Sequence, residues 1–216
     1  MGRRERRESA TEVYRLSSLL LHYPDSALLG AREEIGRVVA GLPRSDAVAA
    51  LERFLGWWAR ADGDEIAAHY VATFDLSKRS GLYLTFYSDG DKRERGAALL
   101  RLKRLYRAAG LPLEGTTELP DFLPVMLEFA ASAPRGRGEI VLREHRAALE
   151  LLRLSVRELG SPYADVLDAV CDTLGAPSAL ERATVGRLAA AGPPQELVGL
   201  EPFAPPEVMP DAGVRP

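Results

Sequence analysis

Residues 9–25 read SATEVYRLSSLLLHYPD, a stretch in which apolar side chains recur at steps of three and four residues. Side chains with that spacing lie on one face of an α-helix, so the stretch predicts an amphipathic helix that begins near Ser9 or Thr11. Its apolar face is formed by Val13, Leu16, Leu19, Leu20 and Tyr23. Pro24 ends the helix, because proline disfavours the helical conformation of the residue before it.

The same period continues along most of the chain and predicts further helices. We expect a second helix capped by Asp25 or Ser26, a third capped by Ser45, a fourth carrying Ile66, Tyr70 and Phe74, and a short one carrying Leu82, Tyr83 and Phe86. These are followed by a helix capped by Asp91 and closed by Gly110, one that begins close to Asp121, a long one from about Glu139 to Leu159, and a last clear one with its apolar face between Tyr163 and Leu174. Strand-like alternation is confined to residues 82–87, where it is short and ambiguous. The pattern therefore predicts an all-α fold.

Pro124 restricts where the helix after residue 118 can begin. Proline is tolerated in the first turn of a helix, where its missing N–H would have no intrahelical partner, so we expect the start close to Asp121. The inward positions of this helix are Phe122, Leu123, Met126, Leu127 and Ala130.

Length and composition indicate one globular domain with a substantial core. The chain has 216 residues, of which 46% are hydrophobic, and a formal net charge of -3 that gives no general attraction to nucleic acids or membranes. A single cysteine excludes an internal disulfide framework and fits a reducing compartment. The three histidines have no Cys or His partner at metal-ligand spacing, and Cys171 and His145 are predicted to lie on core faces.

The two ends of the chain differ from the middle in composition. We expect a flexible basic N-terminus over residues 1–10, a helical domain over residues 11–188, and a proline-rich, disordered tail over residues 189–216. Charged and polar residues interrupt the first apolar stretch, and no run approaches the roughly 18 apolar residues of a membrane span. These features predict a cytoplasmic protein without a signal peptide.

Two polar loops stand out among the helices. Residues 87–96 read YSDGDKRERG and residues 118–124 read ELPDFLP, with more charge and proline than a helix connection requires. Neither loop carries a nucleophile with a paired base, a cysteine–histidine cluster or a phosphate-binding glycine loop. The surplus polar groups therefore indicate recognition rather than catalysis.

The cations of the first loop need an explanation. Asp91 and Glu94 resemble a capping box at a helix start, but Lys92, Arg93 and Arg95 lie in the same turn, where the helix dipole disfavours cations by a few tenths of a kcal/mol each. They could form a structural network of ion pairs or contact carboxylates of a partner. The internal carboxylates available for such pairs are Asp75, Glu118, Asp121 and Glu128.

Large apolar residues, most of them aromatic, lie near both loops, and their position has two interpretations. Phe74, Leu82, Tyr83, Phe86, Tyr87 and Phe122 are core residues by the usual behaviour of large apolar side chains. Alternatively, they form the floor of a groove with a charged rim, which would suit an amphipathic peptide helix. The sequence alone leaves both readings open.

An ordered set of motifs resembles the NarJ family of nitrate reductase assembly chaperones, within the broader TorD/DmsD group of molybdoenzyme maturation chaperones. The set consists of Leu20-Leu21-His22-Tyr23-Pro24-Asp25, residues 70–75, residues 82–85, Gly90-Asp91 with Arg95-Gly96, Leu99-Leu100, Tyr106 with Gly110-Leu111, and Glu118-Leu119-Pro120-Asp121-Phe122-Leu123-Pro124 followed by Leu127-Glu128-Phe129. It covers roughly residues 12 to 175. One departure is Asp89, which occupies a position where the family often has histidine.

The resemblance implies a single-domain helical bundle of the TorD/NarJ type that acts as a cytoplasmic chaperone and is not an enzyme, with no cofactor of its own. Its expected partner is the N-terminal segment of the catalytic subunit of a respiratory nitrate reductase, which it holds for molybdenum cofactor insertion before membrane docking. Proteins of molybdenum cofactor biosynthesis are further expected partners. By residue type and motif, peptide recognition is assigned to Phe74, Asp75, Leu82, Tyr83, Phe86, Tyr87, Asp91, Arg93, Arg95, Glu118, Pro120, Asp121 and Phe122.

Three alternatives remain at this point. The client could be another molybdoenzyme, such as a sulfoxide or N-oxide reductase. The chain could be a helical nucleotide-binding protein that uses Asp91, Arg95 and Asp121, although a phosphate loop is lacking. It could also bind nucleic acid through residues 3–7, against the acidic balance of the rest.

Overall fold

The computed structural model describes residues 3–77, 79–89, 93–113, 115, 117–134 and 137–191. Over these residues the chain is helical, with one isolated β-bridge and no strand, so the all-α prediction is confirmed. The elements are α1 (Arg3–Leu20), α2 (Ser26–Gly30), α3 (Arg32–Ala40), α4 (Asp46–Trp58), α5 (Gly63–Tyr70), the π-helical turn η1 (Val71–Asp75), α6 (Leu84–Asp89), α7 (Arg93–Ala108), α8 (Leu123–Ser132), α9 (Arg137–Glu144), α10 (Arg146–Glu158), α11 (Tyr163–Leu174) and α12 (Ala179–Ala191).

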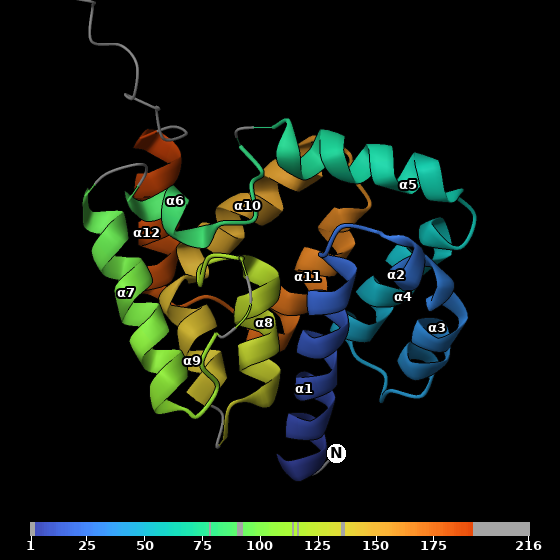
Figure 1. Cartoon of the computed structure of the whole chain (residues 1–216), viewed down its shortest axis with the longest axis horizontal. Coiled ribbons are helices and arrows are strands. Elements are labelled where there is room, and N and C mark those ends of the chain that lie inside the picture. Colours follow the sequence, from blue (N-terminus) through green and yellow to red (C-terminus); the bar gives the residue numbers. More distant parts are fainter. Residues whose placement is uncertain are drawn as a thin grey trace, which may run out of the picture.

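Helices α1, α8 and α11 form the centre of the bundle (Figure 1). α1 packs against α8 and α11, and α4 covers another side of α11. Most residues of α8 and α11 are buried, as expected for helices that are apolar on nearly all sides. The inward positions predicted for α8, from Phe122 to Ala130, are all buried, and Pro124 lies in the first turn.

Several helix ends agree with the chemistry of capping. The side chains of Asp25 and Ser45 accept hydrogen bonds from the amides of Leu28 and Val48, at the starts of α2 and α4. Gly110 adopts a positive φ of 78° directly after α7, which is the usual way for glycine to close a helix.

The structure corrects the expected ends of the domain. α1 begins at Arg3, so residues 3–10 are helical rather than flexible, and Ala10 packs against the core. After residue 174 the chain forms a further helix, α12, which continues past the expected boundary at residue 188. The helix is started by a reciprocal cap, since the Ser178 amide donates to Glu181 and the Glu181 amide donates to the Ser178 hydroxyl. Residues 192–216, which include most of the predicted tail, lie outside the described residues.

Two predicted helices are each divided into two. The helix expected over residues 139–159 is interrupted at His145, whose ring Nδ1 lies 2.9 Å from the carbonyl oxygen of Val141. His145 is only half-buried, so its predicted core position is wrong. The helix expected after Asp25 is interrupted at Ala31, where φ and ψ leave the helical region. Gly30, a poor helix former, ends α2 directly before Ala31, whereas the break at His145 follows no glycine or proline.

The part of the chain between α5 and α8 departs most from regular helix. α5 continues into η1, where the amide of Leu76 donates to the carbonyl of Val71 over five residues, in a wide π-helical turn. Residues 82 and 83 precede α6 rather than lying on it, and Tyr83 forms an antiparallel bridge with Phe122. Within the described ranges, no helix combines the length and apolar character that crossing a membrane requires.

Candidate functional site

The β-bridge joins residues 82–84, which precede the first polar loop, to residues 121–123 of the second. The Leu84 amide donates to the carbonyl of Asp121 at 3.0 Å, and the Leu123 amide donates to the carbonyl of Leu82 at 2.8 Å. The hydroxyl of Tyr106, on α7, donates to the carbonyl of Pro120 at 2.7 Å. Two segments that are more than thirty residues apart in the sequence are thus held side by side. Residues of both segments line the same cavity.

Asp121 lies beneath this junction and is completely buried. Its Oδ2 accepts hydrogen bonds from the hydroxyl of Thr85 at 2.5 Å and from the amide of Thr85 at 3.3 Å, and it lies 3.5 Å from the guanidinium of Arg95. Arg95 also donates to the Thr85 hydroxyl at 3.2 Å and lies over the ring of Phe86, 5.8 Å from its centroid. For Arg95, the structure therefore contains the internal ion pair that was one of the two alternatives.

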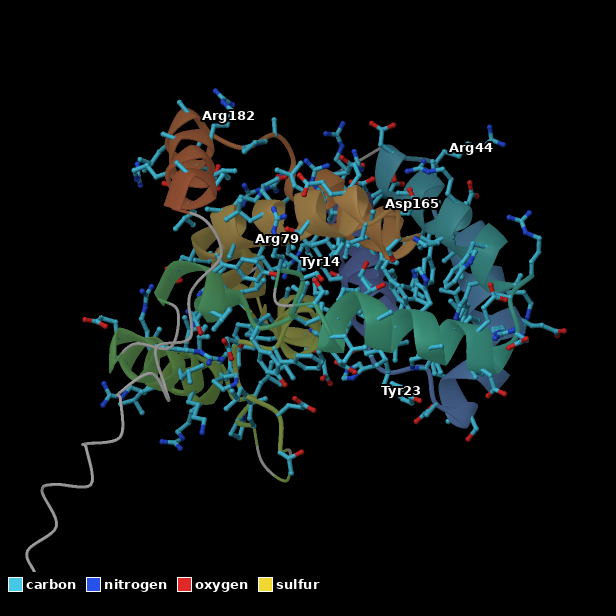
Figure 2. All side chains as sticks on the ribbon, turned by 90° about the horizontal axis from the view of Figure 1, so that it is seen from above. Tyr14, Tyr23, Arg44, Arg79, Asp165 and Arg182 are labelled. Atoms are coloured by element: carbon cyan, nitrogen blue, oxygen red, sulfur yellow. The ribbon has the colours of Figure 1, made fainter. Side chains whose placement is uncertain are left out.

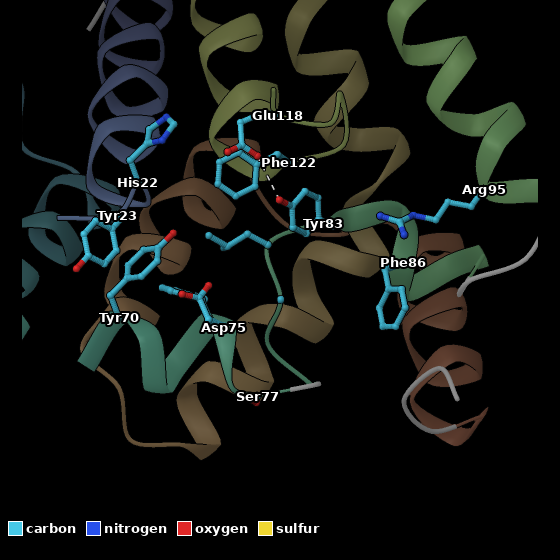
Figure 3. Close-up of a pocket in the computed structure, with 13 residues that line it drawn as sticks. His22, Tyr23, Tyr70, Asp75, Ser77, Tyr83, Phe86, Arg95, Glu118 and Phe122 are labelled. Atoms are coloured by element: carbon cyan, nitrogen blue, oxygen red, sulfur yellow. Dashed lines mark hydrogen bonds between the residues drawn. The ribbon is translucent and has the colours of Figure 1, made fainter. Parts of the chain in front are cut away.

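A cavity of about 570 Å³ opens next to this cluster (Figure 3). The close-up shows His22 and Tyr23 at one end, Phe86 and Arg95 at the other, and Tyr83 and Phe122 between them. The lining residues come from the segment after α1, from α5 and η1, from residue 77 and residues 81–86, from α7 and from the loop before α8: His22, Tyr23, Tyr70, Phe74, Asp75, Ser77, Gly81, Leu82, Tyr83, Phe86, Arg95, Glu118 and Phe122.

Aromatic rings in contact with one another form much of the cavity wall. Tyr70 meets Phe74 edge-on, with ring centroids 5.0 Å apart, and Tyr23 meets Tyr70 at 5.7 Å. On the opposite side the rings of Tyr83 and Phe122 lie 5.2 Å apart. Rings that support each other in this way offer a firm apolar surface for large side chains of a ligand.

Polar groups lie on the same wall. The hydroxyl of Tyr83 donates to a carboxylate oxygen of Glu118 at 3.2 Å (Figure 3, dashed line). Burial, together with the Glu118 carboxylate, raises the pKa of Tyr83 to about 12, so the phenol keeps its proton at neutral pH. Burial lowers the pKa of His22 below its ordinary value, although the carboxylates of Glu118, Glu128 and Asp25 oppose this. His22 is therefore mainly uncharged at neutral pH.

Eight of the thirteen residues predicted for recognition line this cavity. They are Phe74, Asp75, Leu82, Tyr83, Phe86, Arg95, Glu118 and Phe122. Phe74, Leu82 and Phe122 are also buried. These three residues therefore belong to the hydrophobic core and also form part of the cavity floor.

The other five predicted residues have different positions. Pro120 and Asp121 are buried beneath the cavity and support it rather than line it. The hydroxyl of Tyr87 donates to the carbonyls of Arg79 and Gly81, which holds the segment before α6 in place. Asp91 and the side chain of Arg93 lie outside the described residues.

Sequence reasoning missed five lining residues, namely His22, Tyr23, Tyr70, Ser77 and Gly81. Tyr70 was predicted as a member of a helix face directed at the core, and it is indeed buried while its ring also borders the cavity. His22 and Tyr23 follow directly after α1, in the motif LLHYPD. Two polar-tipped aromatic rings next to a helix-ending proline are a signal that could have indicated them.

The lining of the cavity has the chemistry of a binding site. In the part of the chain that the structure describes, no group of three or more His, Cys, Asp or Glu side chains is arranged to hold a metal ion. His69, which directly precedes the lining residue Tyr70, lies 2.8 Å from the Ser161 hydroxyl and stacks on Tyr163, so it has a structural role. Aromatic rings and carboxylates at one opening can hold apolar and cationic side chains together.

Comparisons with known proteins give consistent results. The family model for the nitrate reductase delta subunit matches residues 42–169, more than half of the chain. The NarJ protein of Bacillus subtilis is 33% identical over 73% of this chain and 85% of its own length. The Escherichia coli nitrate reductase molybdenum cofactor assembly chaperone NarJ is 34% identical over 70% of this chain and 64% of its own length.

Two further comparisons concern a longer relative and the fold. The nitrate reductase-like protein NarX of Mycobacterium tuberculosis is 40% identical over 74% of this chain, which spans only 24% of NarX. A crystal structure of a candidate redox enzyme maturation protein from Archaeoglobus fulgidus superposes with a TM-score of 0.54 over 83% of this chain and 93% of that one, at 22% identity. The fold is thus shared beyond close sequence similarity. By its family match and its similarity to the NarJ proteins, the chain belongs to the nitrate reductase delta subunit family.

Proposed function

We propose that this protein is a cytoplasmic assembly chaperone of a respiratory nitrate reductase and not an enzyme. It binds the N-terminal segment of the catalytic subunit and holds the apoenzyme for molybdenum cofactor insertion before the enzyme docks at the membrane. Proteins of molybdenum cofactor biosynthesis are its further partners. The observation that carries the proposal is the cavity of about 570 Å³ with aromatic walls, which is lined by Arg95 of the first polar loop and by Glu118 and Phe122 of the second.

The binding mode that we propose is a helix in a groove. Apolar side chains of the client segment pack on Tyr83, Phe86 and Phe122, while Glu118 and Asp75 interact with its polar or cationic groups. Burial of a large apolar side chain contributes about 1.5–3 kcal/mol, so a few of them allow micromolar affinity after the cost of ordering the peptide is subtracted.

Asp121 and Arg95 have supporting roles in this mode. Their ion pair holds the start of α7 against the loop before α8, and Arg95 keeps its guanidinium over the Phe86 ring at the end of the cavity. A rigid wall requires less ordering when the client binds, which favours affinity.

Calorimetric titration with a synthetic peptide tests the proposal directly. The peptide is the first part of the nitrate reductase catalytic subunit, about 30 residues, which is enough for several helical turns. We expect saturable one-to-one binding that Phe86→Asp weakens at least about tenfold, because a charge replaces an apolar contact. Leu154→Asp on α10 serves as the control, since Leu154 is 41% exposed and does not line the cavity.

Circular dichroism of both variants separates binding from folding. Loss of binding with an intact helical spectrum supports the groove, whereas loss of both for Phe86→Asp shows that Phe86 is a core residue. A peptide of the same length from a sulfoxide reductase identifies the client class: tighter binding of that peptide would assign the protein to another molybdoenzyme. Binding of neither peptide to a folded protein would overturn the proposal.

A further inference from the structure

A second hollow lies on the other side of the chain segment that follows α1. It has a volume of about 700 Å³ and is bordered by α1, α2 and α3. Its apolar lining includes Leu16 and Leu19 of α1, Leu28 of α2, and Ile35 and Val38 of α3. The function proposed above does not use this hollow.

Large apolar side chains are left exposed around it. Leu19 is 44% exposed, Tyr23 51% and Val38 40%, and all three line the hollow. Tyr23 lies at the periphery of the molecule, whereas Tyr14, nine residues earlier in the sequence, is buried (Figure 2). Exposed apolar residues scattered singly are ordinary, but several around one concave surface mark an interaction site.

The second hollow adjoins the first. His22 and Tyr23 line both of them, so these two residues form the ridge where the hollows meet. Figure 3 shows both rings at the end of the first cavity that is distant from Phe86 and Arg95. The two hollows thus lie on either side of the same two side chains.

The combined surface is acidic. Its lining includes five carboxylates, Glu12, Asp25, Glu34, Asp75 and Glu118, and two guanidiniums, Arg15 and Arg95. Both guanidiniums are paired internally, Arg15 with Glu12 at 2.5 Å and Arg95 with Asp121 at 3.5 Å. An excess of carboxylates around apolar walls is complementary to a ligand that carries both apolar and cationic side chains.

We infer that the two hollows form one continuous binding surface, and that its occupant is a basic amphipathic segment of the client polypeptide long enough to fill both. This inference rests on the proposed function and adds to it the length and charge of the segment. Apolar side chains of the segment occupy each hollow in turn, and its Lys or Arg side chains face Glu34, Asp25 and Asp75.

Nested peptides of the catalytic subunit's N-terminus test the length. One has about 15 residues and the other about 30, which correspond to helices of roughly 22 and 45 Å. The double variant Leu19→Asp/Val38→Asp is expected to weaken binding of the long peptide at least about tenfold and to leave binding of the short peptide unchanged. Leu154→Asp is again the control, because its exposure matches that of Leu19 and Val38.

A charge reversal tests the second hollow without an effect on apolar packing. Glu34→Lys is expected to weaken binding of the long peptide several-fold, and the loss should shrink as salt is added. Glu33→Lys is the matched control, since Glu33 is exposed in the same first turn of α3 but does not line the hollow. A long peptide with its Lys and Arg residues replaced by Gln should lose the difference between the two variants.

The outcomes separate this inference from the function on which it rests. If Phe86→Asp abolishes binding while the Leu19/Val38 and Glu34 variants bind the long peptide like the unchanged protein, the second hollow is not part of the site and the inference is overturned. If no peptide binds the folded protein, the proposed function fails as well. If the Leu19/Val38 variant instead dissociates a dimer in sedimentation experiments, the occupant is a second copy of the chain and the inference is wrong.

Discussion

The buried carboxylate of Asp121 accepts the hydroxyl hydrogen of Thr85 at 2.5 Å, and this bond ties the loop before α8 to the first turn of α6. The pair joins two residues that lie 36 positions apart in the sequence. The wall of the candidate site therefore depends on a side chain that does not itself line the cavity.

Asp121→Ala should destabilise the protein by about 2–4 kcal/mol, because it leaves the Thr85 hydroxyl and the Arg95 guanidinium without their acceptor in a largely buried place. Urea denaturation followed by circular dichroism measures the change. The control is Glu144→Ala, which removes the ion pair with Arg101, whose side chain is 68% exposed; we expect a loss of about 1 kcal/mol or less. Equal losses for the two variants would contradict the role given to Asp121.

Gly138→Ala should destabilise the contact between α8 and α9. A Cβ atom at this position would lie 2.3 Å from Cα of Ala130 and 2.6 Å from the carbonyl oxygen of Phe129, and both are backbone atoms that cannot move aside alone. We expect a loss of about 1–3 kcal/mol or more in the free energy of unfolding.

Gly36→Ala, in α3, is the matched control, because there is space for the added methyl group. No atom lies within 4 Å of the added Cβ, so the better helix propensity of alanine should increase stability by about 0.5–1 kcal/mol. A stabilising Gly138→Ala, or a strongly destabilising Gly36→Ala, would show that the packing of these helices differs from the structure.

Stability should fall as the pH is lowered through the range in which the unfolded histidines take up protons. Burial is the main cause that lowers the pKa of His22 and of His69 below 6.5, so the unfolded chain binds more protons than the folded one below that pH. The stability that the two uncharged histidines contribute is fully present above pH 6.5. It is lost as the pH falls from 6.5 through their lower pKa values in the folded protein.

Thermal unfolding between about pH 7.5 and pH 5.5 measures this dependence. The double variant His22→Gln/His69→Gln should give a flatter curve of Tm against pH than the unchanged protein. An unchanged slope would mean that other groups cause the acid sensitivity.

Cys171 should react slowly with thiol reagents in the folded protein. Burial raises the pKa of its thiol to about 12, with the carboxylate of Glu150 adding to the effect, so very little thiolate forms at neutral pH. A chromogenic disulfide reagent should label it rapidly only after denaturant is added. Fast labelling of the native protein would show that α11 opens readily.

Helix positions were largely predictable because most of them depend on local chemistry. The apolar period and the side chains of Asp25, Ser45 and Pro124 indicate where helices begin, and these positions agree with the structure. α12 was missed because its apolar residues have no clear face, as shown by Leu180, which is 74% exposed. The interruption at His145, whose ring contacts the carbonyl of Val141 four residues earlier, does not appear in the apolar period.

The site was predictable only in part, for a different reason. Phe74, Tyr83 and Glu118 could be selected as aromatic or charged residues near unusual loops, and all three line the cavity. The pairing of Tyr83 with Phe122 is a long-range contact, and the burial of Asp121 follows from it. Sequence spacing gives no information on which of two neighbouring polar residues lies beneath the surface and which borders the cavity.

The π-helical turn η1 has a consequence for how this family can vary. The turn holds one residue more than an α-helical turn, so deletion of a single codon between Val71 and Phe74 would restore an ordinary helix. Phe74 and Asp75 would then rotate by about 100° relative to α5 and leave the cavity wall. A chain with one residue fewer at this place would keep the bundle but change the floor of the cavity, so its length at η1 sets which side chains the cavity presents.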